Sequence, residues 1–145
     1  MSKFKYKYEG IKNVKEAFEK KAQKELSVID LMIKRKEEEI EQLLEEKKEH
    51  KSKMTSTKKI KVSDLKFSEN FQKVIEAKIK EKESEIVELK NKRLLKLRDL
   101  EQKSKEAKVF NKLKEKHFHD YRVTENRNEM KEIDDVATRK HSTKS

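Results

Sequence analysis

A helical pattern of apolar residues runs through most of this chain and lapses only once, which restricts the fold more than any other feature. The lapse lies at residues 52–63, where Ser, Thr and β-branched residues cluster and favour other backbone conformations. About 50 residues of helical pattern precede this stretch and about 70 follow it. The sequence therefore predicts an all-α fold in which two long helices, the second longer than the first, form an antiparallel coiled-coil hairpin.

The boundaries of the predicted elements follow from residues that typically begin or end helices and from the points where the helical pattern of apolar residues starts and stops. The first residues alternate aromatic and basic side chains up to Gly10, in a segment too short and isolated to form a sheet. Ser63 or Asp64 is expected to cap the second helix, and the pattern fades after Tyr121. The predicted segments are an extended lead-in over 1–10, a first helix over 11–56, a turn over 57–63, a second helix over 64–136 and a disordered tail over 137–145.

Composition supports a paired helix rather than a globular core. Of the 145 residues, 48% are charged and 32% are hydrophobic, which is too few apolar side chains to enclose a core but enough to bury a seam. Here the seam is the line of side chains that each helix turns toward the other. Pro is absent and Gly occurs once, so nothing interrupts the helices. The lack of Cys is what a reducing cytoplasm permits, and the lack of an apolar run of about 20 residues and of a signal peptide predicts a soluble intracellular protein.

The predicted seam of the first helix changes its spacing near Leu26. Before Leu26 the steps are longer than a heptad, which predicts a nearly straight seam, and after it they follow a heptad. Lys36, Lys47 and His50 fall at inward positions and are expected to bury only their stems. The predicted seam residues are Ile11, Val14, Phe18, Ala22, Leu26, Ile29, Ile33, Lys36, Ile40, Leu43, Lys47, His50 and Met54.

The second helix carries a longer apolar stripe that becomes irregular near Arg93. Leu94, Leu95 and Leu97 cover more than one face there, so either the register shifts or some of these leucines meet another partner. The predicted seam residues are Phe67, Phe71, Ile75, Ile79, Ile86, Leu89, Arg93, Leu97, Leu100, Ala107, Phe110, Leu113, Phe118 and Tyr121.

Helix lengths predict that the second helix extends beyond the first. At about 1.5 Å per residue the two helices are about 70 Å and about 110 Å long. A turn near residue 58 places residue 26 opposite about residue 90 and residue 11 opposite about residue 108. The apolar residues from Phe110 to Tyr121 then lie beyond the first helix. Either the aromatic lead-in, with Phe4, Tyr6 and Tyr8, folds over them or another protein covers them.

Charge and chemistry exclude most other functions. The net charge of +11 suggests nucleic-acid binding, but an acidic belt at residues 37–49 and a basic belt at residues 90–98 overlap only partly, which is typical of solvated helix faces. His117 and His119 are two residues apart and point to different sides of a helix, so no metal site is expected. Without a Gly-rich loop, a Cys nucleophile or a pocket, we expect neither an enzyme nor a cofactor.

The residues also resemble a known family. The aromatic and basic start at residues 4–9 is followed by Ile11, Val14, Lys15, Glu19, Ala22 and Leu26, then by a broken middle and a second helix entered through Phe71 and Ile75. Over residues 4–125 this pattern is similar to the FliJ/YscO-like family, small coiled-coil proteins of the flagellar type III export apparatus. Lys15 stands where that family often has Arg, and Lys78 and Lys82 depart from its pattern.

The resemblance implies a non-enzymatic protein that inserts, like the γ subunit of rotary ATPases, into the ring of the export ATPase FliI. It also implies binding to the export gate protein FlhA and to export chaperones, and so a place at the inner face of the cell membrane through these partners. By the resemblance, the gate contact falls on Phe71 and Ile75. The ring-inserting end falls on residues 11–26 and 107–125, with contacts at Ile11, Val14, Phe18, Phe110, Leu113, Phe118 and Tyr121.

Two other hypotheses remain from the residues alone. A basic nucleic-acid-binding coiled coil would use Lys58, Lys59 and Lys61 with the basic belt at residues 90–98, although no aromatic residues interleave with these lysines to stack on bases. A structural or scaffold rod would associate with further copies through Leu94, Leu95 and Leu97.

Overall fold

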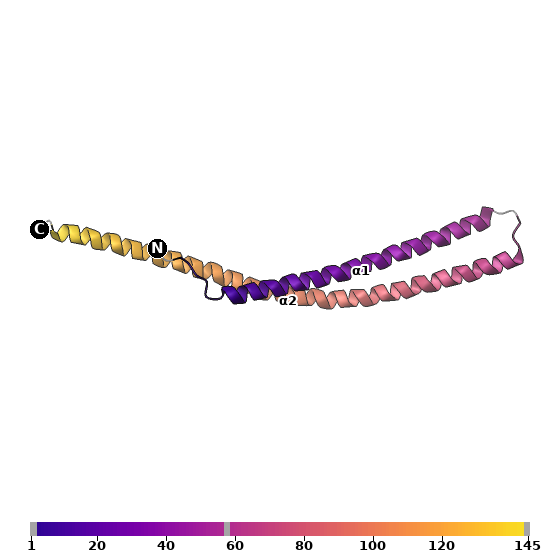
Figure 1. Ribbon diagram of the computed structural model, residues 1–145, viewed down its shortest axis with the longest axis horizontal. Coiled ribbons are helices and arrows are strands. Elements are labelled where there is room, and N and C mark those ends of the chain that lie inside the picture. The colour runs from indigo at the N-terminus through magenta and orange to yellow at the C-terminus, as the bar shows by residue number, and fades with distance from the viewer. Residues whose placement is uncertain (1–2, 57–58, 144–145) are drawn as a thin grey trace. The chain divides into compact units, whose positions relative to one another are not determined.

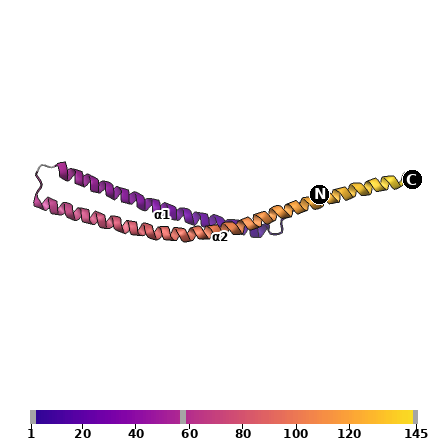
Figure 2. The same cartoon turned by 180° about the vertical axis from the view of Figure 1, so that it is seen from behind.

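The computed structural model describes residues 3–56 and 59–143 and contains two long helices. Helix α1 spans Glu9–Ser56 with 48 residues, and α2 spans Val62–Thr143 with 82 residues. Figure 1 and the reverse view in Figure 2 show α1 and α2 running side by side in opposite directions. The predicted all-α hairpin with a longer second helix is confirmed.

Both helices begin earlier than the sequence pattern predicts. In α1 the backbone N–H of Lys12 donates to the carbonyl of Tyr8 at 2.9 Å, and Glu9 lies in the first turn. A carboxylate there interacts favourably with the positive end of the helix dipole. In α2 the N–H groups of Asp64 and Leu65 donate to the carbonyl of Lys61 at 3.0 and 3.1 Å. The prediction that Ser63 or Asp64 caps α2 is therefore wrong, because both residues are already helical.

The predicted disordered tail is wrong as far as the structure describes it, because α2 continues beyond residue 136 to Thr143. No Pro or Gly stops the helix there. Lys140 and His141 lie in the last turn, where basic side chains interact favourably with the negative end of the helix dipole. Residues 144–145 lie outside the described residues, as do residues 1–2 of the lead-in and residues 57–58 of the predicted turn.

Tertiary contacts divide the chain into two units, which are described separately. Unit 1 comprises the residues up to Lys20 together with the chain from Glu101 onward, and unit 2 comprises Lys21–Leu100. Unit 2 contains an apolar cluster of Ile29, Ile33 and Ile86, each 8–9% exposed, against which Ile40 and Leu89 pack. Burial of apolar side chains by both helices holds this unit together.

Ion pairs between the helices fix the register of unit 2. Glu25 accepts from Lys96 at 2.9 Å, whereas the prediction placed residue 26 opposite about residue 90. The true register therefore differs from the predicted one by about six residues. The prediction assumed a turn centred on residue 58, but the cross-helix ion pairs are symmetric about a point closer to the start of α2. The other cross-helix pairs are Lys36 with Glu85 at 2.7 Å, Lys82 with Glu39 at 2.5 Å, Lys47 with Glu76 at 3.2 Å and Arg93 with Asp30 at 2.5 Å.

The seam of α1 follows the prediction from Ala22 onward and departs from it before Ala22. Ala22, Ile29 and Ile33 are buried, and the remaining predicted seam residues up to Met54 are buried or half-buried. In the first turns, however, Lys12 is 9% exposed, whereas the predicted seam residues Ile11, Val14 and Phe18 are 47, 50 and 47% exposed. The heptad phase therefore continues to the start of α1 with polar inward residues, and the predicted straight seam is wrong.

The seam of α2 agrees with the prediction at most positions. Ile75, Ile86 and Ala107 are 2, 8 and 2% exposed. The exceptions are Phe67, which is 67% exposed while its neighbour Ser68 is buried, and Phe118, which is 43% exposed. Leu94 and Leu95 are 49 and 64% exposed, so these leucines lie outside the seam.

Candidate partner-binding surfaces

The described residues offer surfaces rather than an enclosed site. They contain no group of three or more His, Cys, Asp or Glu side chains that could hold a metal ion. The hollow of about 410 Å³ between the helices of unit 2 is an open groove lined partly by the ion-paired Lys36, Glu39 and Glu85. Within the same residues, neither helix has a stretch apolar enough and long enough to span a bilayer.

The aromatic lead-in packs on α2 in unit 1. The Phe4 ring lies 5.3 Å from that of Phe118, edge to face, and 5.5 Å from that of Tyr121. The hydroxyl of Tyr6 donates to the carbonyl of Phe110 at 2.9 Å, and burial raises the pKa of this tyrosine. Figures 1 and 2 both show the indigo lead-in along the orange part of α2. Of the two alternatives for these α2 residues, cover by the lead-in is therefore the one observed.

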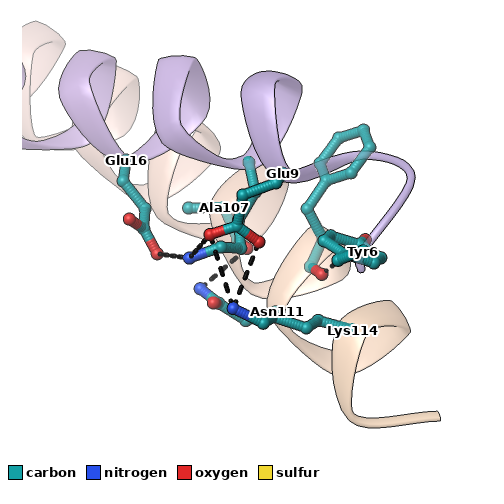
Figure 3. A network of polar contacts seen from close by, with 8 residues as sticks. Tyr6, Glu9, Glu16, Ala107, Asn111 and Lys114 are labelled. Atoms are coloured by element: carbon teal, nitrogen blue, oxygen red, sulfur yellow. Dashed lines mark hydrogen bonds and ion pairs between the residues drawn. The ribbon is translucent and has the colours of Figure 1, made fainter. Parts of the chain in front are cut away.

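A polar network fills the space where the lead-in enters α1 (Figure 3). The ammonium of Lys12 lies 3.3 Å from Glu16 Oε1 and 3.6 Å from Glu9 Oε1, while Lys114 Nζ lies 3.1 Å from Glu9 Oε2. The hydrogen bond from Lys12 lowers the pKa of Glu16, and the bond to Glu16 raises that of Lys12. These contacts compensate for the inward position of Lys12.

A second ion pair in unit 1 also joins the helices. Lys15 Nζ lies 3.2 Å from Glu106 Oε2, and its hydrogen bond lowers the pKa of the Glu106 carboxyl. Beside it, Ala107 is almost fully buried, and its carbonyl accepts from the side-chain amide of Asn111 at 3.1 Å. Unit 1 thus uses polar groups at positions that are apolar in the middle of unit 2.

The residues assigned to the ATPase ring by resemblance all lie in unit 1 but in two environments. Ile11, Val14 and Phe18 form an exposed apolar stripe on successive turns of α1, hereafter the α1 stripe. Lys103 Nζ lies 5.6 Å from the centre of the Phe18 ring. The α2 members are half-buried or, for Phe118, exposed at the edge: Phe110, Leu113, Phe118 and Tyr121.

The residues assigned to the export gate differ from each other in exposure. Ile75 is 2% exposed and lies in the seam, so its side chain is not part of the surface. Phe71 is half-buried, with its ring 4.4 Å from that of His50. The imidazole of His50 also forms a hydrogen bond with the hydroxyl of Ser68 at 2.9 Å. Phe67, which the sequence analysis assigned to the seam, is exposed. Its ring stacks on that of Phe71, with 6.5 Å between the ring centroids.

The basic belt is partly neutralised, which weakens the nucleic-acid hypothesis. Arg93 donates to Asp30 and Lys96 donates to Glu25, so neither side chain presents a free positive charge. Lys59 and Lys61 are exposed, and Lys58 lies outside the described residues. The His117 ring packs against the rings of Tyr6 and Tyr8, at 5.6 and 6.2 Å between centroids, whereas His119 is exposed.

Sequence reasoning missed the exposed apolar residues of the last part of α2. Met130 and Ile133 are 63 and 64% exposed, and Val136 is 51% exposed. The signal was present in the spacing, because the heptad positions that continue from Tyr121 are polar and these apolar residues fall on other faces.

Comparison with known proteins agrees with this architecture. The family model described as flagellar FliJ protein matches residues 4–145, which extends beyond the resemblance at residues 4–125. Neither a curated protein nor a solved structure shows a significant match. The family is a structural component of the flagellar export apparatus rather than a known enzyme. The aromatic lead-in, the paired helices and a match over nearly all of its length lead to one conclusion: the chain belongs to the flagellar FliJ protein family.

Proposed function

We propose that this chain is a non-enzymatic adaptor that inserts its unit 1 into the ring of the export ATPase FliI and links the ring to the export gate protein FlhA and to export chaperones. These partners would hold it at the inner face of the cell membrane. The observation that carries the proposal is the α1 stripe, whose three apolar side chains are about half exposed while lysines occupy the inward positions beside them.

An apolar stripe in this arrangement favours a protein partner. Turning Ile11, Val14 and Phe18 inward would bury apolar area within the chain, yet the helix keeps them outward. Apolar residues on adjacent turns are the usual anchors of a helix that binds in an apolar groove or channel. In unit 1 the start of α1 lies beside the later part of α2, and this two-helix segment is the part that would enter the ring.

For the gate contact, the proposal assigns different roles to the two residues of the resemblance. Phe71 and its exposed neighbours Phe67 and Val74, the latter 53% exposed, would contact FlhA. Ile75 would hold this part of α2 against α1 from the seam side. A few well-packed side chains usually carry most of the binding energy of an interface, and the half-buried Phe71 beside the exposed Phe67 would be such a site.

The test compares two triple variants of the full chain in binding to purified FliI and in stimulation of its ATPase activity. In the first, Ile11, Val14 and Phe18 are changed to Gln. In the control, three equally exposed residues of unit 2 are changed to Gln: Val28, Leu31 and Leu44, which are 51, 48 and 50% exposed.

The α1-stripe variant is expected to lose ring binding by at least about tenfold, with an unchanged circular dichroism spectrum, since all three side chains are exposed. The control should bind the ring normally, and both variants should bind FlhA as the parent chain does. Equal loss in both triple variants, or full ring binding by the α1-stripe variant, would contradict the proposal.

A further inference from the structure

The face of α2 that points away from α1 in unit 1 is basic. At 3.6 residues per turn, Lys105, Lys108, Lys112 and Lys116 fall on one side of the helix, opposite inward residues such as Phe110. All four lysines are exposed, and none has an ion pair with a carboxylate among the described residues. Elsewhere in the hairpin, inward lysines such as Lys15 are paired. This face therefore presents a row of four lysines that form no ion pair with the described residues.

Apolar side chains accompany these lysines on the same side of α2. Val109 lies between Lys108 and Lys112 in sequence and is 60% exposed. Met130 falls on the same side several turns later and is 63% exposed. The row of lysines with these two residues is hereafter the outer face of α2. Glu115 borders it, and Glu101 and Asp120 fall on that side one turn before Lys105 and one turn after Lys116.

We propose that the outer face of α2 binds directly to the surface of an anionic lipid bilayer. The lysine ammonium groups would meet phosphate headgroups while their stems and the side chains of Val109 and Met130 lie toward the acyl boundary. A nucleic acid is less well matched, because no exposed Phe, Tyr or Trp side chain of the described residues lies on this side of α2 to stack on bases. Charge complementarity with a flat anionic surface, combined with flanking apolar residues, selects the bilayer.

This inference goes beyond the proposed function, in which partners alone hold the chain at the membrane. A ring that encloses unit 1 would cover the outer face of α2, so lipid binding and ring insertion exclude each other. The test needs only the purified full chain and vesicles. Its failure is therefore distinguishable from a failure of the proposed ring contact.

The experiment measures cosedimentation of the full chain with vesicles of phosphatidylcholine containing about one third phosphatidylglycerol, and with vesicles of phosphatidylcholine alone. The test variant changes Lys105, Lys108, Lys112 and Lys116 to Gln. The matched control changes four exposed lysines of α1 to Gln: Lys24, Lys34, Lys48 and Lys51. A further pair of variants compares Met130→Gln with Val136→Gln, since Val136 falls on another side of α2.

The parent chain is expected to bind the anionic vesicles and not the neutral ones. Its binding should weaken as the salt concentration rises. The test variant should lose about six-hundredfold in partitioning, since each of the four lysines near the surface contributes about fivefold. The control should lose much less, and Met130→Gln should bind more weakly than Val136→Gln.

Absence of binding to the anionic vesicles at low salt would overturn the proposal. So would equal losses in the test and control variants. A variant with Lys3, Lys5 and Lys7 changed to Gln provides the remaining comparison, since these exposed lead-in lysines belong to the same unit. If it loses binding while the test variant does not, the lipid contact lies on the lead-in and not on α2. Tighter binding to a short DNA duplex than to the vesicles would also overturn it.

Discussion

The two units of the hairpin keep the same heptad phase but place different residues at the inward positions. In unit 2 these positions carry Ile29, Ile33 and Ile86, which form an apolar cluster. In unit 1 they carry Lys12 and the small Ala107, while apolar side chains of α1 point outward. The direction a side chain faces is therefore set by the phase of the whole helix rather than by its own polarity.

This difference predicts unequal stability. Burying an isoleucine side chain contributes about 2–3 kcal/mol, whereas partly exposed ion pairs contribute little. Unit 2 has several buried isoleucines, while unit 1 relies on ion pairs and on the packing of Phe4 and Tyr6 against α2. Unit 1 should then open at lower free energy, and its outward apolar residues remain available to a partner.

The largest effect is expected from a charge in the apolar cluster. Ile33→Asp places a carboxylate without a partner among Ile29 and Ile86, which should destabilise the chain by several kcal/mol. Leu31→Asp, at a position 48% exposed, serves as the control and should change stability by less than about 0.5 kcal/mol. Thermal melting followed by circular dichroism measures both, and similar melting of the two variants would show that the seam is misassigned.

Phe71→Ala separates partner binding from packing near the start of α2. Under the proposed function, this truncation should weaken FlhA binding by about 2 kcal/mol, roughly thirtyfold. Since Phe71 is half-buried against His50, a loss of stability smaller than the 3 kcal/mol or more typical of a core phenylalanine is expected. Calorimetric binding and thermal melting decide between the two roles. A strongly destabilised variant that still binds FlhA fully would remove Phe71 from the contact.

Lys12→Leu should raise the melting temperature by a few degrees, because it gives unit 1 an apolar inward residue like those of unit 2. The carboxylates of Glu9 and Glu16 are partly exposed and keep their access to water when Lys12 is replaced. As a control, Lys20→Leu changes an exposed residue and should leave the melting temperature nearly unchanged. A lower melting temperature for Lys12→Leu would mean that the ion pairs hold unit 1 more strongly than apolar burial could.

Tyr6→Phe tests how the lead-in holds α2. It removes the hydroxyl that donates to the Phe110 carbonyl but keeps the ring. We expect amide hydrogen exchange near Phe110 to become about fivefold faster, with no change in unit 2. Tyr8→Phe is the matched control, since the Tyr8 hydroxyl, unlike that of Tyr6, forms no hydrogen bond with the described part of the chain. Unchanged exchange in both variants would indicate that ring packing alone fixes the lead-in.

Acidification should have the smallest effect and should weaken both units. The pKa values of Glu16 and Glu106 lie below the ordinary 4.5 because of hydrogen bonds from Lys12 and Lys15. Their contribution to stability is present above pH 4.5 and is lost as the pH falls through their lowered pKa values. Protection factors from hydrogen exchange should therefore fall in unit 1 between pH 5 and pH 3. They should fall in unit 2 as well, because hydrogen bonds from Lys96 and Lys82 lower the pKa values of Glu25 and Glu39 there. A fall that begins above pH 5 would require another titrating group.

Sequence reasoning succeeded where apolar residues occupy the inward heptad positions and failed where polar residues occupy them. The all-α hairpin and the seam from Leu26 to Met54 follow directly from apolar spacing. Apolar spacing misplaced Ile11, Val14 and Phe18, because it cannot show that paired carboxylates and a buried lysine stem make an inward Lys12 acceptable. The register was misjudged by about six residues, because it depends on cross-helix pairs such as Glu25 with Lys96 that sequence spacing does not reveal.

Hydrogen exchange within α2 tests the difference between the units most directly. Residues 80–93 of unit 2 and residues 103–117 of unit 1 both lie in the interior of this helix, so fraying of its ends affects neither. We predict that backbone amides in residues 103–117 exchange at least about tenfold faster. The α1 residues that pack beside this segment are Lys12 and Lys15 instead of isoleucines, which leaves a lower free energy of opening. Equal or slower exchange in residues 103–117 would contradict the account.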